Sequence, residues 1–203
     1  MALAYTKYPA DAFETLQINA GVVAKNFDPA AGTLAQADIL GATTGGIQIT
    51  CTPNYSDYGE DVDNVPVNTK QLKVINDWTV TASGSFVSLN AETAKLLTGA
   101  ADLTASTGKI TPRADLVDAD FEDIWFVGDY GNRSGNGGCI AVRIIDALSN
   151  SGFSLQTQKN NKGQFAFEFM GHYDLEDANR TPPFEIYVKA GAASTNQGGG
   201  TPH

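Results

Sequence analysis

Residues 78–86 read Trp-Thr-Val-Thr-Ala-Ser-Gly-Ser-Phe, an alternation of apolar or small residues with Thr and Ser. A period of two places successive side chains on opposite faces of a strand. This segment therefore predicts a strand with one buried face and one face of small polar side chains. Antiparallel sheets commonly have this one-sided burial.

The same alternation recurs along the chain, in residues 16–22, 47–52, 140–145, 164–173 and 184–188. One segment differs, because the run Ile-Trp-Phe-Val at 124–127 is apolar on both faces. A strand of this kind needs cover on both sides. A second protomer or an internal helix would provide it.

A single helix is predicted, over about residues 90–98. Asn90 is a suitable N-cap, Leu96 and Leu97 supply a narrow apolar face, and Gly99 suits the left-handed position that ends many helices. One short helix among strands predicts a mainly β fold. We expect an antiparallel β-sandwich or barrel-like domain with one short flanking α-helix.

The length and the punctuation of the chain predict its organisation. Its 203 residues favour one domain, which we place at 1–190. Residues 54–73 contain no clear alternation after Pro53 and predict a long loop. Residues 191–203, with three consecutive glycines, predict a disordered tail.

The charge balance argues against nucleic-acid binding and membrane insertion. Thirteen Lys and Arg against 23 Asp and Glu give a formal charge of −10, with no basic cluster. No apolar run approaches the roughly 18 residues of a membrane-spanning helix. Residues 1–11 show no secretion signal, so we expect Cys51 and Cys139 to be reduced thiols, although the two could pair.

Residue patterns for catalysis, cofactors and metals are weak, and we predict a non-enzymatic protein. His172 lies on the polar side of its strand, where a hydrogen-bonding or solvent-facing role is expected, and the other histidine is the last residue. No nucleophile elbow or P-loop is present. Two acidic clusters lack the EF-hand pattern and are predicted to be solvated or interface-forming, not calcium sites. They are Asp57, Glu60, Asp61 and Asp63, and Asp118, Asp120, Glu122 and Asp123.

The order of these elements is similar to that of a known family. A strand at 18–22 (Ile-Asn-Ala-Gly-Val) precedes one that ends in Thr-Cys-Thr-Pro at 50–53, and an acidic loop leads to 64–73. The strand at 77–87 is followed at once by the helix at 89–97. This layout, over most of residues 11–189, resembles the major tail (tail tube) proteins of long-tailed bacteriophages, particularly those that infect Gram-positive hosts.

The resemblance implies a structural virion protein. Hexameric rings of such a protein stack into a hollow tube through which DNA passes into the host without specific binding. Contractile injection systems and type VI secretion have tubes of the same fold. The family implies a tape measure protein and a tail terminator as partners, assembly in the bacterial cytoplasm and a place in the virion tail, with no membrane insertion.

Two sets of residues are candidates for that role. The small polar strand faces would suit a wet lumen wall, although such faces are commonly the solvent side of an ordinary sheet. Their members are Gln48, Thr50, Thr79, Thr81, Ser83, Ser85 and Glu168. The loop is expected to contact the next ring, with its carboxylates meeting bases such as Lys70, Lys73 or Arg113. The candidate ring-stacking residues are Asp57, Glu60, Asp61, Asp63, Lys70 and Lys73.

Two other functions compete with this one. A carbohydrate-binding β-sandwich module of a phage or secreted protein would need exposed aromatic side chains. Trp78 and Trp125 both occupy strand positions that predict burial, which leaves Tyr55 and Tyr58 on the loop. A metal-dependent hydrolase would need a divalent ion at the acidic loop.

Overall fold

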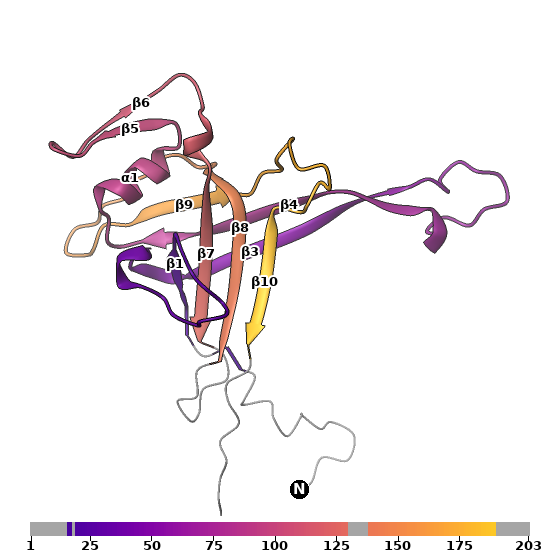
Figure 1. The fold of residues 1–203 in the computed structure, drawn as a ribbon, viewed down its shortest axis with the longest axis horizontal. Helices are drawn as coiled ribbons and strands as arrows, with labels where there is room; N and C mark the ends of the chain where they lie inside the picture. Colours follow the sequence, from indigo (N-terminus) through magenta and orange to yellow (C-terminus); the bar gives the residue numbers. More distant parts are fainter. Residues whose placement is uncertain (1–15, 18, 130–137, 190–203) are drawn as a thin grey trace, which may run out of the picture.

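The computed structural model describes residues 16–17, 19–129 and 138–189. The predicted tail at 191–203 and most of the connection at 130–138 lie outside the described residues. The fold is mainly β and antiparallel with one α-helix, as predicted (Figure 1).

The strands are β1 (Val22–Ala24), β2 (Ile39–Gly41), β3 (Thr43–Asp57), β4 (Lys73–Phe86), β5 (Ala101–Thr104), β6 (Lys109–Pro112), β7 (Glu122–Asp129), β8 (Cys139–Ser149), β9 (Phe165–Met170) and β10 (Phe184–Lys189). The helix is α1 (Ala91–Thr98), and short 3-10 turns are η1 (Gln36–Asp38), η2 (Lys70–Leu72) and η3 (Asp118–Asp120).

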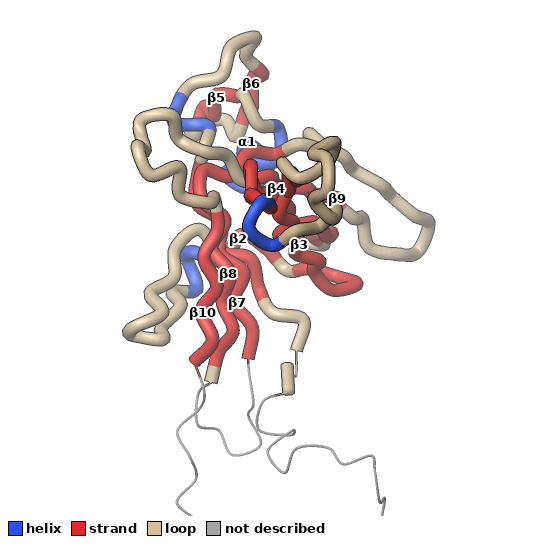
Figure 2. The backbone as a smooth tube through the Cα atoms, turned by 90° about the vertical axis from the view of Figure 1, so that its right-hand side faces the viewer, coloured by secondary structure: helices blue, strands red, loops and turns tan. Residues whose placement is uncertain are grey.

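Strand β8 belongs to two layers of the sheet. Its first half pairs with β7 and β10, and its last residues, Leu148 and Ser149, pair with β9. The order is β2-β1-β7-β8-β9-β4-β3, with β10 added beside β8. In Figure 1 the layer of β3, β4 and β9 crosses the layer of β7, β8 and β10, and Figure 2 shows the latter three side by side.

The two layers meet at a bulge in β8. The register shifts between Glu122 and Ile124 of β7, so that β8 contributes one extra residue there. Asp146 lies in this bulge at φ 48° and donates its backbone N–H to the Asp123 carboxylate (3.2 Å). Bulges bend the strand that carries them, which explains how β8 turns from one layer into the other.

The main core lies between the two layers and α1. Phe86, Phe169 and Val80 of the β4–β9 layer are fully buried against Ile124, Ile144 and Leu97. The N-cap prediction is confirmed, because the Asn90 side chain accepts the Thr93 N–H (2.7 Å). Gly99 ends the helix at φ 79°, where a glycine carries no Cβ penalty.

The two faces of 124–127 have different covers, and the second is neither a protomer nor a helix. Ile124 faces the main core, whereas Trp125 packs on the other side against Phe27, Leu34 and Tyr187. Phe27 and Leu34 belong to the irregular segment 25–38, which ends in η1. The second face of this strand is therefore covered by the chain's own loop.

Three predicted boundaries are wrong. The strand predicted at 164–173 ends at Met170, so His172 and Tyr173 lie beyond it. The first strand covers only Val22–Ala24, because Gly21 has φ 68° and interrupts the extended backbone predicted from residue 16. The predicted loop at 54–73 is shorter, because β3 continues through Asp57 and pairs with β4 down to Lys73. Strands β2, β5 and β6 were not predicted; each is only three or four residues long.

Candidate functional site

The predicted lumen residues share one face of the β3–β4–β9 layer. Thr50 lies opposite Thr81, and Gln48, Ser83 and Glu168 form a row across all three strands. Thr79 and Ser85 extend the same face at either end. All of these side chains are exposed or partly exposed, whereas the alternate residues of the same strands enter the core. We call these aligned residues, with Thr44, Thr52 and Asn54, the polar face.

The polar face carries few charges. Glu168 accepts a hydrogen bond from the Asn150 amide (2.9 Å), and Asp77 at the end of the face accepts one from Asn54. From Asp77 to Ser85 of β4, and at the positions of β3 and β9 paired with them, this face has no Lys or Arg; the first cation on the same alternation is Lys73, opposite Asp57. The face therefore offers hydroxyl and amide groups, with no cation for a phosphate.

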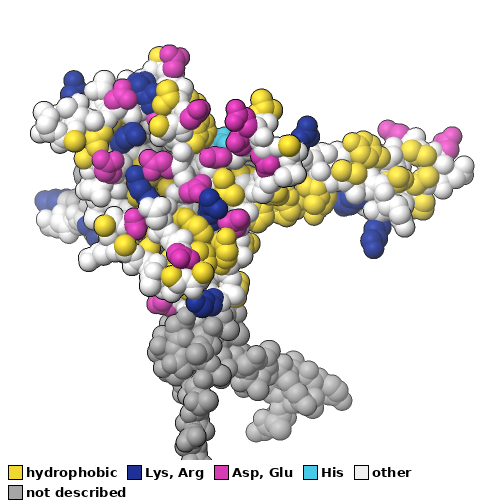
Figure 3. All heavy atoms as spheres, viewed as in Figure 1, with side chains coloured by type: hydrophobic (Ala, Val, Ile, Leu, Met, Phe, Trp, Pro, Cys, Tyr) yellow, Lys and Arg dark blue, Asp and Glu magenta, His cyan; other side chains and the backbone are white. Residues whose placement is uncertain are grey.

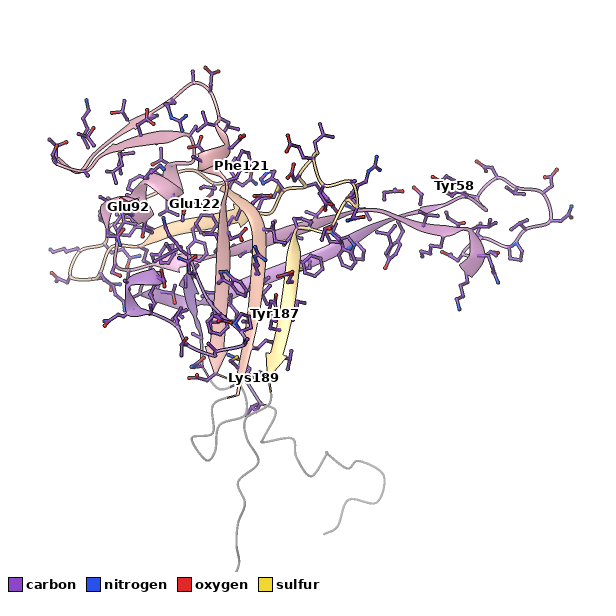
Figure 4. The ribbon with its side chains drawn as sticks, viewed as in Figure 1. Tyr58, Glu92, Phe121, Glu122, Tyr187 and Lys189 are labelled. Carbon is purple, nitrogen blue, oxygen red and sulfur yellow. The ribbon has the colours of Figure 1, made fainter. Side chains whose placement is uncertain are left out.

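Beyond the body of the molecule, β3 and β4 continue as a two-stranded arm (Figures 1 and 3). We define the arm as residues 54–77. Its members include large apolar side chains that are 43–65% exposed: Tyr55, Tyr58, Val62, Val67, Val74 and Ile75. Figure 4 shows Tyr58 near the outer end. Exposed apolar groups gathered on one projection are typical of interaction surfaces.

Asp57 organises the tip of the arm. Its carboxylate accepts the backbone N–H groups of Gly59 (2.9 Å) and Asn68 (2.6 Å). These bonds, the one from Asn68 first, lower the pKa of Asp57 below its ordinary value. The tip is thus held by an ionised carboxylate, so Asp57 has an internal structural role.

The other predicted stacking residues lie around this tip. Glu60, Asp61, Asp63 and Lys70 are exposed, and Lys73 lies opposite Asp57 with its Nζ 4.9 Å from the Tyr55 ring centre. Arg113, predicted as a basic partner of the loop, already forms ion pairs with Asp102 and Asp120. Of the predicted basic residues, neither Lys70 nor Lys73 has an ion-pair partner among the described residues.

Two long edges of the sheet lack a neighbouring strand in the described chain. Strand β3 ends the sheet order, and β10 pairs with β8 alone. On β10, Ile186 is 56% and Val188 57% exposed. Unpaired N–H and C=O groups along such edges are templates for pairing with another chain.

A cavity of about 740 Å³ lies at the base of the arm. Residues 75–78 of β4 form one wall, and the segment between β9 and β10 contributes residues that include Tyr173, Leu175 and Arg180. Trp78 is half-buried here, not fully buried as its position predicts, and its backbone N–H donates to the Tyr173 hydroxyl (2.8 Å). Alternation alone could not reveal this cavity, because its second wall has no periodic pattern.

At the joint of the two layers, carboxylates surround His172. Its ring Nδ1 lies 3.0 Å from the backbone oxygen of Asp146, and its ring meets Phe121 edge-on. Burial, followed by the nearby charges of Asp123 and Asp174, raises the pKa of Asp146. The ionised Asp146 carboxylate therefore destabilises the folded chain, first through its burial and then through repulsion from these neighbours.

Replacing Asp146 with Asn should stabilise the protein at neutral pH. Because the pKa of Asp146 is higher in the folded than in the unfolded chain, its carboxyl group favours folding at low pH. This contribution to the free energy of unfolding is lost as pH rises through the folded-state pKa. Asn tolerates the positive φ of this residue and carries no charge. Because Asp146 is only partly buried, we expect only about 1–3 °C in thermal midpoint at pH 7. The gain should vanish near pH 3; an equal gain at both pH values would contradict this electrostatic cause.

Within the described residues, no group of three or more His, Cys, Asp or Glu side chains is placed to hold a metal ion. No helix in those same ranges is long and apolar enough to span a membrane. Cys51 and Cys139 are both free thiols. No protein-family model matches the sequence, and no curated protein matches it. The function proposed below is therefore argued from geometry and chemistry.

Proposed function

We propose that the chain is the subunit of a phage tail tube, a structural virion protein that assembles as stacked hexameric rings around a channel for DNA. One observation carries this proposal: the polar face is in register along β3 and β4 and reaches β9 at Glu168, while its sheet ends in open edges. Such a layer can join copies of itself side by side and present one face inward.

The open edges of the sheet provide a way for copies of the chain to close into a ring. A heterologous contact between two different edges closes into a ring when its rotation divides a full turn. The open edge of β3 and that of β10 are two different surfaces of one molecule. Pairing between copies would satisfy their backbone groups and remove an aggregation hazard.

The polar face suits a channel for DNA because it provides little to hold a phosphate. Duplex DNA carries one negative charge per roughly 1.7 Å, so a basic wall would bind it and slow its passage. The polar face has hydroxyls, amides and a few carboxylates. DNA would be weakly repelled and free to slide.

Size-exclusion chromatography with negative-stain electron microscopy tests the proposal. We expect rings or filaments with a central hole at high protein concentration. Mixing with duplex DNA at physiological salt should cause no binding. A protein that stays monomeric at every concentration tried would contradict the proposal.

A second candidate function, carbohydrate binding, is favoured by one observation. Trp78 and Tyr173 line the cavity at the base of the arm, together with polar groups such as Asn76 and Asp177. Aromatic faces beside hydrogen-bonding groups are common in ligand sites. A soluble monomer that binds oligosaccharides through this cavity would support this second candidate.

A further inference from the structure

Strand β10 forms an open edge of the sheet and carries side chains on both faces. In Figure 2 it lies at the outer side of its neighbour β8. Alternation along the strand places Glu185, Tyr187 and Lys189 on one face, and Ile186 and Val188 on the other. Ile186 and Val188 are 56% and 57% exposed. An edge of this kind is a template for a further strand.

Glu185 shares its cation with a second carboxylate. Arg143 of β8 forms ion pairs with both Asp123 and Glu185, so two negative charges surround one guanidinium. Hydrogen bonds from the Tyr187 hydroxyl (2.7 Å) and from Arg143 (3.1 Å) outweigh burial and lower the pKa of Glu185. Glu185 is therefore ionised at neutral pH, and its side chain is 39% exposed, so that a further cation can reach it.

Lys189 provides the complementary charge on the same face. It is exposed and has no ion-pair partner among the described residues, and its Nζ lies 3.4 Å from the backbone oxygen of Ala30. Glu185 and Lys189 stand roughly 13 Å apart along the strand, at about 3.3 Å per residue, with Tyr187 between them. The two charges are thus available to another chain.

We propose that β10 pairs with the β10 strand of a second copy, antiparallel and about a two-fold axis at Tyr187. Glu185 of each copy then lies opposite Lys189 of the other (Figure 4). Ile186 lies opposite Val188, and the two Tyr187 side chains face each other. Opposite charges and aromatic pairs across neighbouring strands stabilise a sheet. Contact between Ile186 and Val188 removes apolar surface from water.

The positions of the charges favour this register over others. An axis at Ile186 would place Glu185 opposite Tyr187, and an axis at Glu185 would bring two carboxylates together. Like charges directly opposite each other destabilise a sheet. A parallel pair in register would also place like charges beside each other. The other open edge is less complementary, because β3 has no charged side chain before Asp57.

The inference goes beyond the proposed function. A two-fold contact uses the same surface on both copies, so it closes at two chains and does not continue. The open edge of β10 accepts one strand at a time, so a chain in the dimer does not offer this edge to β3 of a ring neighbour. The dimer would therefore be a reserve form, from which rings assemble only after the two copies separate.

Sedimentation velocity of the full chain over a dilution series, below the concentration that yields rings, is the primary test. We expect a reversible dimer. Lys189→Glu should weaken it at least tenfold, because two carboxylates then lie opposite each other at both ends of the contact. Lys162→Glu is the matched control, since it makes the same charge change at an exposed position between β8 and β9; it should dimerise normally. Mixing Lys189→Glu chains with Glu185→Lys chains should restore the dimer, which a folding defect would not allow.

A cysteine at the axis tests the register. With Cys51 and Cys139 replaced by Ala, Tyr187→Cys should form a disulfide-linked dimer on mild oxidation, because the two residues lie directly opposite each other. Glu185→Cys should not, because the two residues at that position would stand roughly 13 Å apart at about 3.3 Å per residue.

The outcomes separate this inference from the proposed function. An unchanged dimer of Lys189→Glu, or equal cross-linking by Tyr187→Cys and Glu185→Cys, would overturn the inference. Rings that form from monomers with no dimer would also overturn it and leave the tube proposal standing. A cross-linked two-fold dimer that forms no rings or filaments at any concentration would support the inference and contradict the tube proposal. Wild-type protein that stays monomeric throughout would overturn both.

Discussion

Deleting residues 60–64 from the tip of the arm should leave a folded monomer that no longer forms tubes. The five residues are exposed, and none contributes to either core cluster. Asp57 and both backbone groups that it binds, in Gly59 and Asn68, are retained. A shorter loop also costs slightly less entropy to close. We therefore expect the thermal midpoint to move by only about 2 °C.

The measurement is electron microscopy and sedimentation of the deletion variant beside wild-type protein. A matched variant in which residues 60–64 are replaced by Gly and Ser distinguishes the loss of these side chains from the shortening of the loop. If the acidic and apolar side chains of the tip make the contact, both variants should lose filaments. Tubes of normal length from the deletion variant would show that the tip has no role in stacking.

The positions that repeat every two residues could be assigned to faces from the sequence. In residues 78–86, Val80 and Phe86 are fully buried and Thr79 is exposed, as the alternation predicts. Pairing then aligns such faces between strands, so the polar face follows from period and register together. The helix was equally predictable, because its cap residues act locally.

The sequence does not predict the arm, because Pro53 favours the end of a strand. Proline lacks the backbone N–H that a hydrogen-bonded strand pair needs, so a proline ends a strand in the centre of a sheet. Here Pro53 of β3 lies opposite Trp78 of β4. Strand β3 is an edge strand of the described sheet, where proline is tolerated. Knowing that β3 is an edge requires the whole sheet order, which depends on contacts between distant residues.

The cover of Trp125 and the cavity beside Trp78 were missed for a related reason. Phe27 and Leu34 come from an irregular segment, and Tyr173 and Leu175 come from another. Neither segment has a period that marks a buried side. Periodicity predicts that a residue faces inward, but the neighbour that covers it, wholly or in part, is set by tertiary packing.

If the polar face lines a channel for DNA, as proposed, placing lysines on it should make that wall bind DNA. In the double variant Thr50→Lys and Thr81→Lys, the new ammonium groups lie side by side, because these residues are directly paired on β3 and β4. Each lysine that neutralises a phosphate makes the slope of log K for DNA binding against log salt concentration about 0.9 more negative. Repeated around a ring, the substitutions should raise DNA binding to filaments by at least about tenfold at low salt.

Co-sedimentation of short duplex DNA with filaments, at about 50 and 200 mM salt, measures this effect. The matched control carries Thr104→Lys and Ser106→Lys, which add the same charge at exposed positions of the β5–β6 turn, away from the polar face. If the polar face lines the channel, only the first variant should retain DNA that resists nuclease, because DNA on the outer surface stays accessible. Equal retention by both variants, or nuclease-sensitive binding by the first, would place the polar face outside the channel. The charge of a wall, not its shape, then decides whether DNA is held or released.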